Sequence, residues 1–441
     1  MRFTDLGFIF ILLPLAAVCY YILPKKARPA ALFFISALFF LLAEPCFIWL
    51  FAALIPDFVF AYRADRIEMQ KRKLPCLVII LKNTAISVIW GVILPIAKAV
   101  DAPIGLIPFC ITSTEFSIIR SREAIRPCGF FESAASVTFF ARMQSGPVGG
   151  VRKLISQLEK ASPSLSSISR GAMLIICGTA KRVILAEQLF VIFRTIAEMP
   201  VAYYSTALGW LCAICGAMCI YFTLSAYSDI ARGIANVFSI SVPRTVYFPF
   251  QAKSLRDYIY RLNMPLEDTL NRLLLPGTRR EGGNTANYFI SLMMPCIIAM
   301  LLSPSANSLL WAIYLAALLV IDWLILRHIP VFMAFPARVV TFLITLPSYI
   351  LLLPSAFSNR LYLMASLLPS ETIPLINDDA IYLLTTNAPL LFVAVICCMS
   401  ALDALSRLTE KQLPQLWWII SALSHAVLFV LTVSFLLWNV R

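Results

Sequence analysis

KSLRDYIYRLNMPLEDTLNRLLLPG, residues 253–277, is the least membrane-like stretch of a very apolar chain. Ser254 followed by Asp257 resembles the capping box that begins many helices. Apolar residues then recur at spacings of three and four, which predicts one buried helical face made of Leu255, Tyr258, Ile259 and Leu262.

A second amphipathic phase follows in the same stretch. Pro265 suits the first turn of a new helix, with Asn263 or Met264 as its cap, and Pro276-Gly277 suits its end. The apolar face of this second helix would be Leu266, Leu270, Leu273 and Leu274. Two short helices that meet at Asn263 are therefore predicted, either in the membrane interface or dipping between membrane helices. A solvated loop that hugs the lipid surface is the alternative.

The rest of the chain predicts an all-α polytopic membrane protein. Of its 441 residues 60% are hydrophobic and 13% are charged, and a crossing needs about 20 mostly apolar residues. Eleven or twelve helical crossings are expected, because a lipid-exposed backbone must satisfy its own hydrogen bonds. No hydrophilic stretch would form a separate soluble domain, so residues 1–441 are expected to be one membrane-embedded domain. The apolar runs are 7–23, 29–43, 46–62, 83–100, 104–119, 171–193, 203–226, 286–303, 308–326, 331–353, 381–402 and 417–437.

The charge pattern predicts an orientation in the plasma membrane. The net charge of +13 gathers in the loops 25–28, 63–73, 120–126 and 244–280, which the positive-inside rule places in the cytoplasm. We therefore expect the N-terminus outside and the amphipathic segment 227–283 on the cytoplasmic side. The first apolar run has no basic n-region or cleavage site and is expected to be retained as a helix. The bilayer, and no nucleic acid, is the partner that this charge indicates.

Several stretches, in order, resemble the membrane-bound O-acyltransferase (MBOAT) family, and in particular its alginate O-acetylation and teichoic-acid D-alanylation branch. They are the N-terminal run ending in Ala43-Glu44-Pro45, IGLIPFCITSTEFSIIRSREA, VTFFARMQSGPVGGVRKL with Phe139, Phe140, Gly146 and Pro147, CGTAKRVILAEQLF, YSDIARGI with Tyr227, Ser228 and Asp229, and RVVTFLITLPSYILLL. The resemblance implies a multi-helix bundle with a central tunnel and short interfacial or re-entrant helices.

The resemblance also implies where a catalytic site would lie. Residues 254–280 follow the family segment that carries its first histidine; Arg261 keeps a basic position and Asn263 stands in place of that histidine. The second histidine falls in the window 301–308, anchored on Trp311 and Asp322, where Leu302, Ser303 or Pro304 takes its place. We expect Asn263 and this window to approach each other across an internal cavity. Tyr227, Asp229, Gly146, Pro147 and Asp322 would be motif or tunnel residues.

The two substitutions matter because esterifying a hydroxyl needs a base, and a histidine base contributes roughly 10²–10⁴-fold. Asparagine does not accept a proton at neutral pH, although Asn263 could donate to an oxyanion. Ser303 could act as a nucleophile only beside a base. The chain's histidines are His328 and His425. We interpret the first as interfacial, and the second as a neutral side chain bonded within its helix, with a catalytic role as the alternative.

For the remaining aspartates and cysteines, a structural role is favoured over a functional one. Asp229 and Asp322 are expected to be partners of buried arginine or backbone groups, with a tunnel lining as the alternative. Cys212, Cys215 and Cys219 share one helix face. We interpret them as packing residues and expect no metal, because no nearby histidine completes a tetrahedral set.

Three functions stay open at this point. The favoured one is an MBOAT-like protein that lacks the catalytic histidines and serves as a scaffold, acyl conduit or partner subunit in modifying cell-envelope polysaccharides. The second is an active O-acyltransferase with a non-standard site, which would use an acyl thioester donor and no permanently bound cofactor. An acyl-carrier protein or another envelope-acylation protein is the expected partner in either case. The third, an unrelated transporter, would need half-helix pairs or rows of buried charge.

Overall fold

The computed structural model describes residues 3–43, 55–60, 62–94, 97, 105–122, 129–142, 147–160, 164–274, 285–302, 305–324, 334–352, 357–371, 373–399 and 401–440. The named elements among these residues are all helices, and the one β-pairing among them is an isolated bridge between Ser370 and Ile373. The all-α fold predicted from the sequence is confirmed.

The helices of the N-terminal half are α1 Leu13–Ile22, α2 Arg28–Ala43, α4 Lys73–Val88, α6 Leu106–Arg122, α7 Phe130–Thr138, α8 Val151–Lys160, α9 Leu165–Ala180, α10 Glu187–Glu198 and α11 Thr206–Val237. Those of the C-terminal half are α12 Leu255–Leu262, α13 Met264–Leu274, α14 Thr285–Leu302, α15 Ala306–Leu324, α16 Ala334–Thr345, α17 Ser348–Leu351, α18 Phe357–Ser366, α19 Asp378–Thr386, α20 Ala388–Cys398, α21 Ala401–Gln412 and α22 Pro414–Val440. Three π-helical turns, η1 Phe8–Leu12, η5 Ile89–Ile93 and η7 Lys181–Ala186, adjoin α1, α4 and α9. Short 3₁₀ turns are η2 Lys25–Ala27, η3 Ala64–Arg66, η4 Met69–Arg72, η6 Phe140–Arg142, η8 Val201–Tyr203 and η9 Pro249–Gln251.

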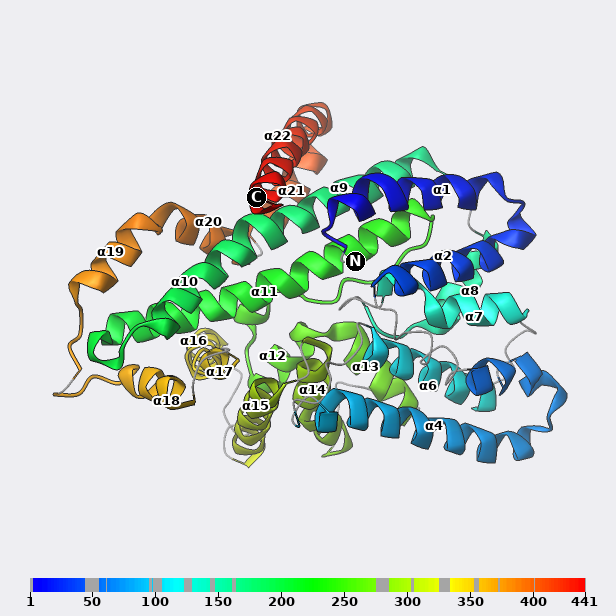
Figure 1. Ribbon diagram of the computed structural model, residues 1–441, viewed down its shortest axis with the longest axis horizontal. Helices are drawn as coiled ribbons and strands as arrows, with labels where there is room; N and C mark the ends of the chain where they lie inside the picture. The colour runs from blue at the N-terminus through cyan, green and yellow to red at the C-terminus, as the bar shows by residue number, and fades with distance from the viewer. Residues whose placement is uncertain are drawn as a thin grey trace.

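Two long rods lie side by side across the middle of the molecule, α11 and the continuous run of α9, η7 and α10 (Figure 1). Gly171 of α9 and Gly233 of α11 face each other, and a Cβ on either would lie 2.7 Å from the other's carbonyl oxygen. Only glycine permits this approach, which is how membrane helices pack closely. α11 contributes to both large apolar cores, one toward the N-terminal helices and one toward the C-terminal helices.

The chain is a polytopic membrane protein. Within the described residues five helices are long and apolar enough to cross a membrane, and α19 and α20, bent by 65°, form a sixth span if counted together. The expectation was eleven or twelve crossings. The five spans are Lys25–Ala43, Met69–Ile93, Thr206–Val237, Ala306–Leu324 and Ile419–Leu437, and three shorter apolar helices are Phe8–Ile22, Tyr288–Leu301 and Pro336–Leu351.

Two of the expected crossings correspond to helices that are not among the five candidate spans. The run 104–119 lies in α6, which buries Glu115 and Arg120. The run 171–193 spans α9, η7 and part of α10, where Lys181 and Arg182 begin the π-helical turn. Neither helix is among the five candidate spans, although charged residues also occur within those, such as Asp229 in α11. The bent pair α19–α20 is a broken helix that the sequence did not reveal, and it is the one such pair in the part of the chain that the structure describes.

The opening stretch forms two helices, as predicted, with α12 and α13 meeting at Asn263. Ser254 Oγ accepts from the backbone N–H of Asp257 at 3.1 Å, so Ser254 is the N-cap of α12. Asp257 Oδ2 accepts from the N–H of Lys253 at 3.1 Å, one residue before the N–H of Ser254 that a full capping box would use. The predicted apolar face of α12 is fully buried, so the segment is tucked between helices and is not a solvated loop. Leu274, at the end of α13, is 53% exposed.

Candidate functional site

Asn263 is the N-cap of α13. Its side-chain Oδ1 accepts a hydrogen bond from the backbone N–H of Leu266 at 3.3 Å, and its carbonyl oxygen accepts from the N–H of Glu267 at 3.3 Å. The residue is 5% exposed. A capping asparagine satisfies a helix N–H that would otherwise lack a partner. The amide of Asn263, which is predicted to stand at the family's histidine position, is therefore engaged in starting a helix.

Thr245 joins Asn263 to the Tyr-Ser-Asp motif on α11. The backbone N–H of Thr245 donates to Ser228 Oγ at 2.9 Å, and the N–H of Met264 donates to the Thr245 carbonyl at 3.0 Å. Ser228 and Thr245 are each 1% exposed. Two motifs far apart in the sequence are thus held together through a loop threonine, a residue that no sequence pattern marks.

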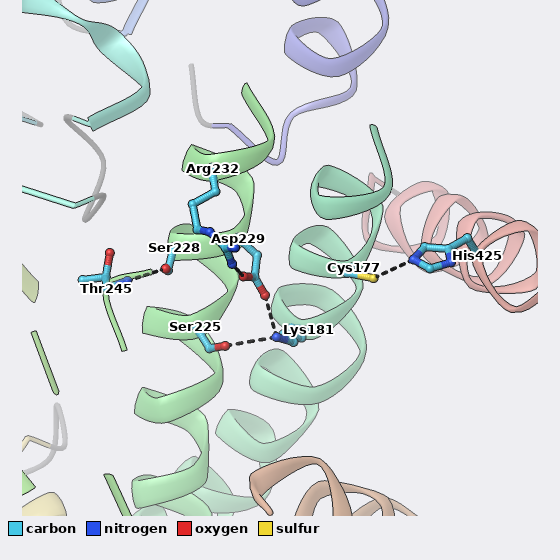
Figure 2. Close-up of polar contacts among 8 residues, drawn as sticks. All are labelled: Cys177, Lys181, Ser225, Ser228, Asp229, Arg232, Thr245 and His425. Atoms are coloured by element: carbon cyan, nitrogen blue, oxygen red, sulfur yellow. Dashed lines mark hydrogen bonds and ion pairs between the residues drawn. The ribbon is translucent and has the colours of Figure 1, made fainter. Parts of the chain in front are cut away.

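Asp229 lies between two cations on the adjoining face of α11 (Figure 2). Lys181 Nζ lies 2.6 Å from Asp229 Oδ2 and also donates to Ser225 Oγ at 3.1 Å. Arg232 Nη1 donates to Asp229 Oδ1 at 3.1 Å. Each carboxylate oxygen therefore has a cationic donor, and the pair with Lys181 links α11 to η7. These are the contacts of a structural ion pair, while a tunnel-lining role stays a prediction.

His425 on α22 reaches Cys177 on α9 (Figure 2). His425 Nδ1 lies 2.7 Å from the Ser421 carbonyl oxygen, so this nitrogen carries the proton and donates it. Nε2 lies 3.4 Å from Cys177 Sγ. The predicted bond of His425 within its own helix is present, while its neutral state stays a prediction. Its thiol partner was missed, because nothing in the sequence brings residues 177 and 425 together.

The remaining predicted residues are spread over other contacts. Arg261 Nε donates to Asp257 Oδ1 at 2.9 Å within α12. Asp322 Oδ2 accepts from Tyr288 Oη at 3.0 Å, which ties α15 to α14. Tyr227 is partly buried against the N-terminal core. Asp322 and Asp229 therefore belong to separate polar contacts.

The predicted approach of Asn263 to the second histidine window stays a prediction. Ser303 and Pro304 lie outside the described residues, as do Gly146 and His328, and Leu302 is described only by its place in α14. α14 does pack against both α12 and α13. Pro147 is buried in the loop that precedes α8.

Glu115 and Arg142 form a buried polar site that the sequence analysis missed. Glu115 Oε1 and Oε2 accept from the backbone N–H groups of Gly150 and Val151 at 2.9 and 3.4 Å, at the start of α8. Arg142, like Glu115, is 2% exposed, and its Nε and Nη1 have no hydrogen-bond partner among the described residues. Burial lowers the pKa of Arg142 to about 10, and Glu115 opposes that effect. The sequence feature that could have revealed this site is Glu115 itself, an acidic residue inside an apolar run.

The loop before α8 also packs directly on α13. Gly149 has a φ of +95°, and a Cβ there would lie 2.0 Å from Thr269 Oγ1. A positive φ and this contact together require glycine. The described part of this loop, from Pro147 onward, thus packs on the helix that Asn263 caps.

Cavities with volumes of about 700, 440 and 200 Å³ are lined by described residues, and neither Asn263, Asp229 nor His425 lines any of these. The central tunnel stays a prediction. No group of three or more His, Cys, Asp or Glu side chains that could hold a metal ion occurs among the described residues. Cys212, Cys215 and Cys219 are buried in an apolar core, as expected of packing residues.

Comparison with known proteins gives the relationship. No family model matches the chain. The probable alginate O-acetylase AlgI of Azotobacter vinelandii is 24% identical over 324 residues, which are 68% of this chain and 64% of that protein. The corresponding protein of Pseudomonas fluorescens is 24% identical over 306 residues, 67% of this chain and 61% of its own length. This chain is a distant homologue of the alginate O-acetylases.

The homology extends to one other kind of acetyltransferase. The peptidoglycan O-acetyltransferase of Helicobacter pylori is 25% identical over 148 residues, 33% of this chain and 28% of that protein. The resemblance to MBOAT-type proteins is thereby confirmed as distant homology. The chain spans less than two thirds of the length of the curated relatives it matches.

Proposed function

We propose that this homologue of polysaccharide O-acetyltransferases has kept the membrane fold and lost the histidine chemistry. It would serve as a scaffold, an acyl-group conduit or a partner subunit in acylating extracytoplasmic polysaccharides. The observation that supports the proposal is the use of Asn263 Oδ1 as the cap of α13. A base must reach the hydroxyl proton of the acceptor, whereas this oxygen is buried and already accepts a backbone N–H.

The proposed orientation puts the N-terminus outside and segment 227–283 in the cytoplasm, following the basic loops. An acyl thioester or an acyl-carrier protein would then approach the basic face that carries α12 and α13. Basic residues near a membrane surface also favour acidic partners electrostatically.

One observation favours an active enzyme with a non-standard site as the second candidate. His425 Nε2 lies 3.4 Å from Cys177 Sγ, and a neutral His425 with its proton on Nδ1 would there be a base beside a nucleophile. In that mechanism His425 would take the thiol proton while Cys177 Sγ attacks the carbonyl carbon of a thioester. The acyl group would move to Cys177, and the donor thiol would leave with its proton.

A cap role for Asn263 predicts a specific stability series. Asn263→Ala should lower the free energy of unfolding by about 1 kcal/mol, because the N–H of Leu266 loses its acceptor. Asn263→Ser should restore most of the loss, since serine is also a strong N-cap. Chemical unfolding of the purified protein in mixed micelles measures both variants. Equal stability of the alanine and serine variants would contradict the cap role.

A further inference from the structure

Two cavities of different chemistry adjoin each other along α13. The first, of about 700 Å³, is mainly apolar and is lined by Met69, Gln70, Lys73, Cys76, Leu77, Ile80, Thr114, Ile118, Ser121, Arg122, Leu270, Leu273 and Leu274. The second, of about 440 Å³, contains Arg122, Arg152, Lys153 and Arg272 in its wall, together with Glu115. Ile118, Arg122 and Leu273 line both. Arg122 Nη1 donates to the Leu273 carbonyl at 2.7 Å, which fixes this shared wall.

The apolar cavity runs along the start of a candidate membrane span. Its wall includes Gln70 and Lys73 near the first residue of the span Met69–Ile93, and Leu77 and Ile80 further along it. At about 1.5 Å per helical residue, Ile80 lies roughly 15 Å along the helix from Gln70. The start of a span lies at headgroup level, so the cavity extends from the headgroups toward the hydrocarbon. Leu77 is 51% exposed and opens the wall toward lipid.

The second cavity favours an anion. Its four basic side chains, Arg122, Arg152, Lys153 and Arg272, belong to exposed residues. Glu115, its one acidic residue, is buried and accepts from the backbone N–H groups of Gly150 and Val151. The lining of the cavity therefore carries four basic residues and one acidic residue, which is a net positive charge. Arginine and lysine side chains at this level of a membrane bind phosphate headgroups.

We propose that the two cavities together bind one anionic phospholipid, with its phosphate in the basic cavity and an acyl chain in the apolar cavity. Because Ile118, Arg122 and Leu273 line both cavities, the cavities are neighbours, and a single amphipathic molecule would reach from one into the other. The lipid would fasten α13 to α4 and α6. This inference does not depend on acyl transfer, because lipid binding is measured separately from turnover.

The experiment is a native mass spectrometry titration of the full chain in detergent with phosphatidylglycerol and, separately, phosphatidylcholine of the same chain length. We expect about tenfold greater occupancy by phosphatidylglycerol. The double variant Lys153→Gln/Arg272→Gln should lose about tenfold of that occupancy. The control Lys25→Gln/Lys26→Gln removes two exposed basic residues at the start of another candidate span and should leave it unchanged.

Two further measurements are made. One tests the contribution of the acyl chain apart from that of the headgroup, and the other tests whether a soluble phosphate competes with the lipid. Leu77→Trp, which narrows the apolar cavity, should lower phosphatidylglycerol occupancy several-fold. Inorganic phosphate and 4′-phosphopantetheine should fail to displace the lipid at equal concentration. Equal binding of both lipids, equal loss in the control variant, or displacement by either soluble phosphate would overturn the proposal.

Discussion

Replacing Asp229 with alanine is expected to lower the free energy of unfolding by about 3–5 kcal/mol. The carboxylate is 7% exposed and accepts from Lys181 at 2.6 Å and from Arg232 at 3.1 Å. Its removal leaves two cations without their acid between η7 and α11, and an unpaired charge in a low-dielectric setting is costly. Equilibrium unfolding in mixed micelles, with helicity as the readout, measures the loss.

The matched control is the exposed pair of Arg194 and Glu198. Its Nε–Oε1 distance is also 2.6 Å, but the two side chains are 62% and 59% exposed. Water screens such a pair, so Glu198→Ala should cost at most about 0.5 kcal/mol. Similar losses in the two variants would mean that Asp229 is not a structural partner, and the tunnel-lining interpretation would replace it.

Glu115→Ala is expected to have an effect of the same size, about 3–5 kcal/mol. The substitution removes the acceptor for two N–H groups at the start of α8 and leaves the Arg142 charge buried. Glu115→Gln should recover part of the loss, because the amide oxygen can still accept one N–H. Limited proteolysis near α8, together with the unfolding measurement, reports whether the helix start has loosened.

Glu132 supplies the control for this substitution. Its Oε2 also accepts a backbone N–H at a helix start, from Gly129 at 3.2 Å before α7, but that contact is exposed. Glu132→Ala should cost about 1 kcal/mol or less. If Glu115→Ala costs no more than Glu132→Ala, the buried interaction with Arg142 does not stabilise the fold.

The sequence predicted well those features that depend on local spacing. The break at Asn263, the N-cap at Ser254 and the buried face of α12 all follow from patterns within one or two helical turns. The long apolar helices of the bundle were likewise predicted from apolar runs in the sequence. The eleven or twelve expected crossings stay a prediction, because hydrophobicity alone does not separate a lipid-facing helix from an interior one such as α6, whose Glu115 accepts two backbone N–H groups inside the protein.

The features that the sequence missed depend on contacts between distant residues. Thr245 joins Ser228 to Met264, and Cys177 meets His425, only once α11, α9 and α22 are packed. In the sequence Glu115 is an isolated acidic residue, whereas in the fold it accepts hydrogen bonds from the backbone N–H groups of Gly150 and Val151. A buried polar residue can be noticed in one sequence, but its partner cannot be read from local periodicity.

The measurement that tests the central claim most directly is transfer of a radiolabelled acetyl group from a thioester donor to polysaccharide, in membranes that carry this chain. We expect wild-type transfer at the background of membranes lacking the protein, and no gain from Asn263→His alone, because base, hydroxyl and thioester must be positioned together. Asn263→His with Ser303→His should raise transfer above that background if the predicted tunnel is open. Strong wild-type transfer that survives Asn263→Ala would contradict the loss of histidine chemistry and, if His425→Ala abolished it, would assign the reaction to His425.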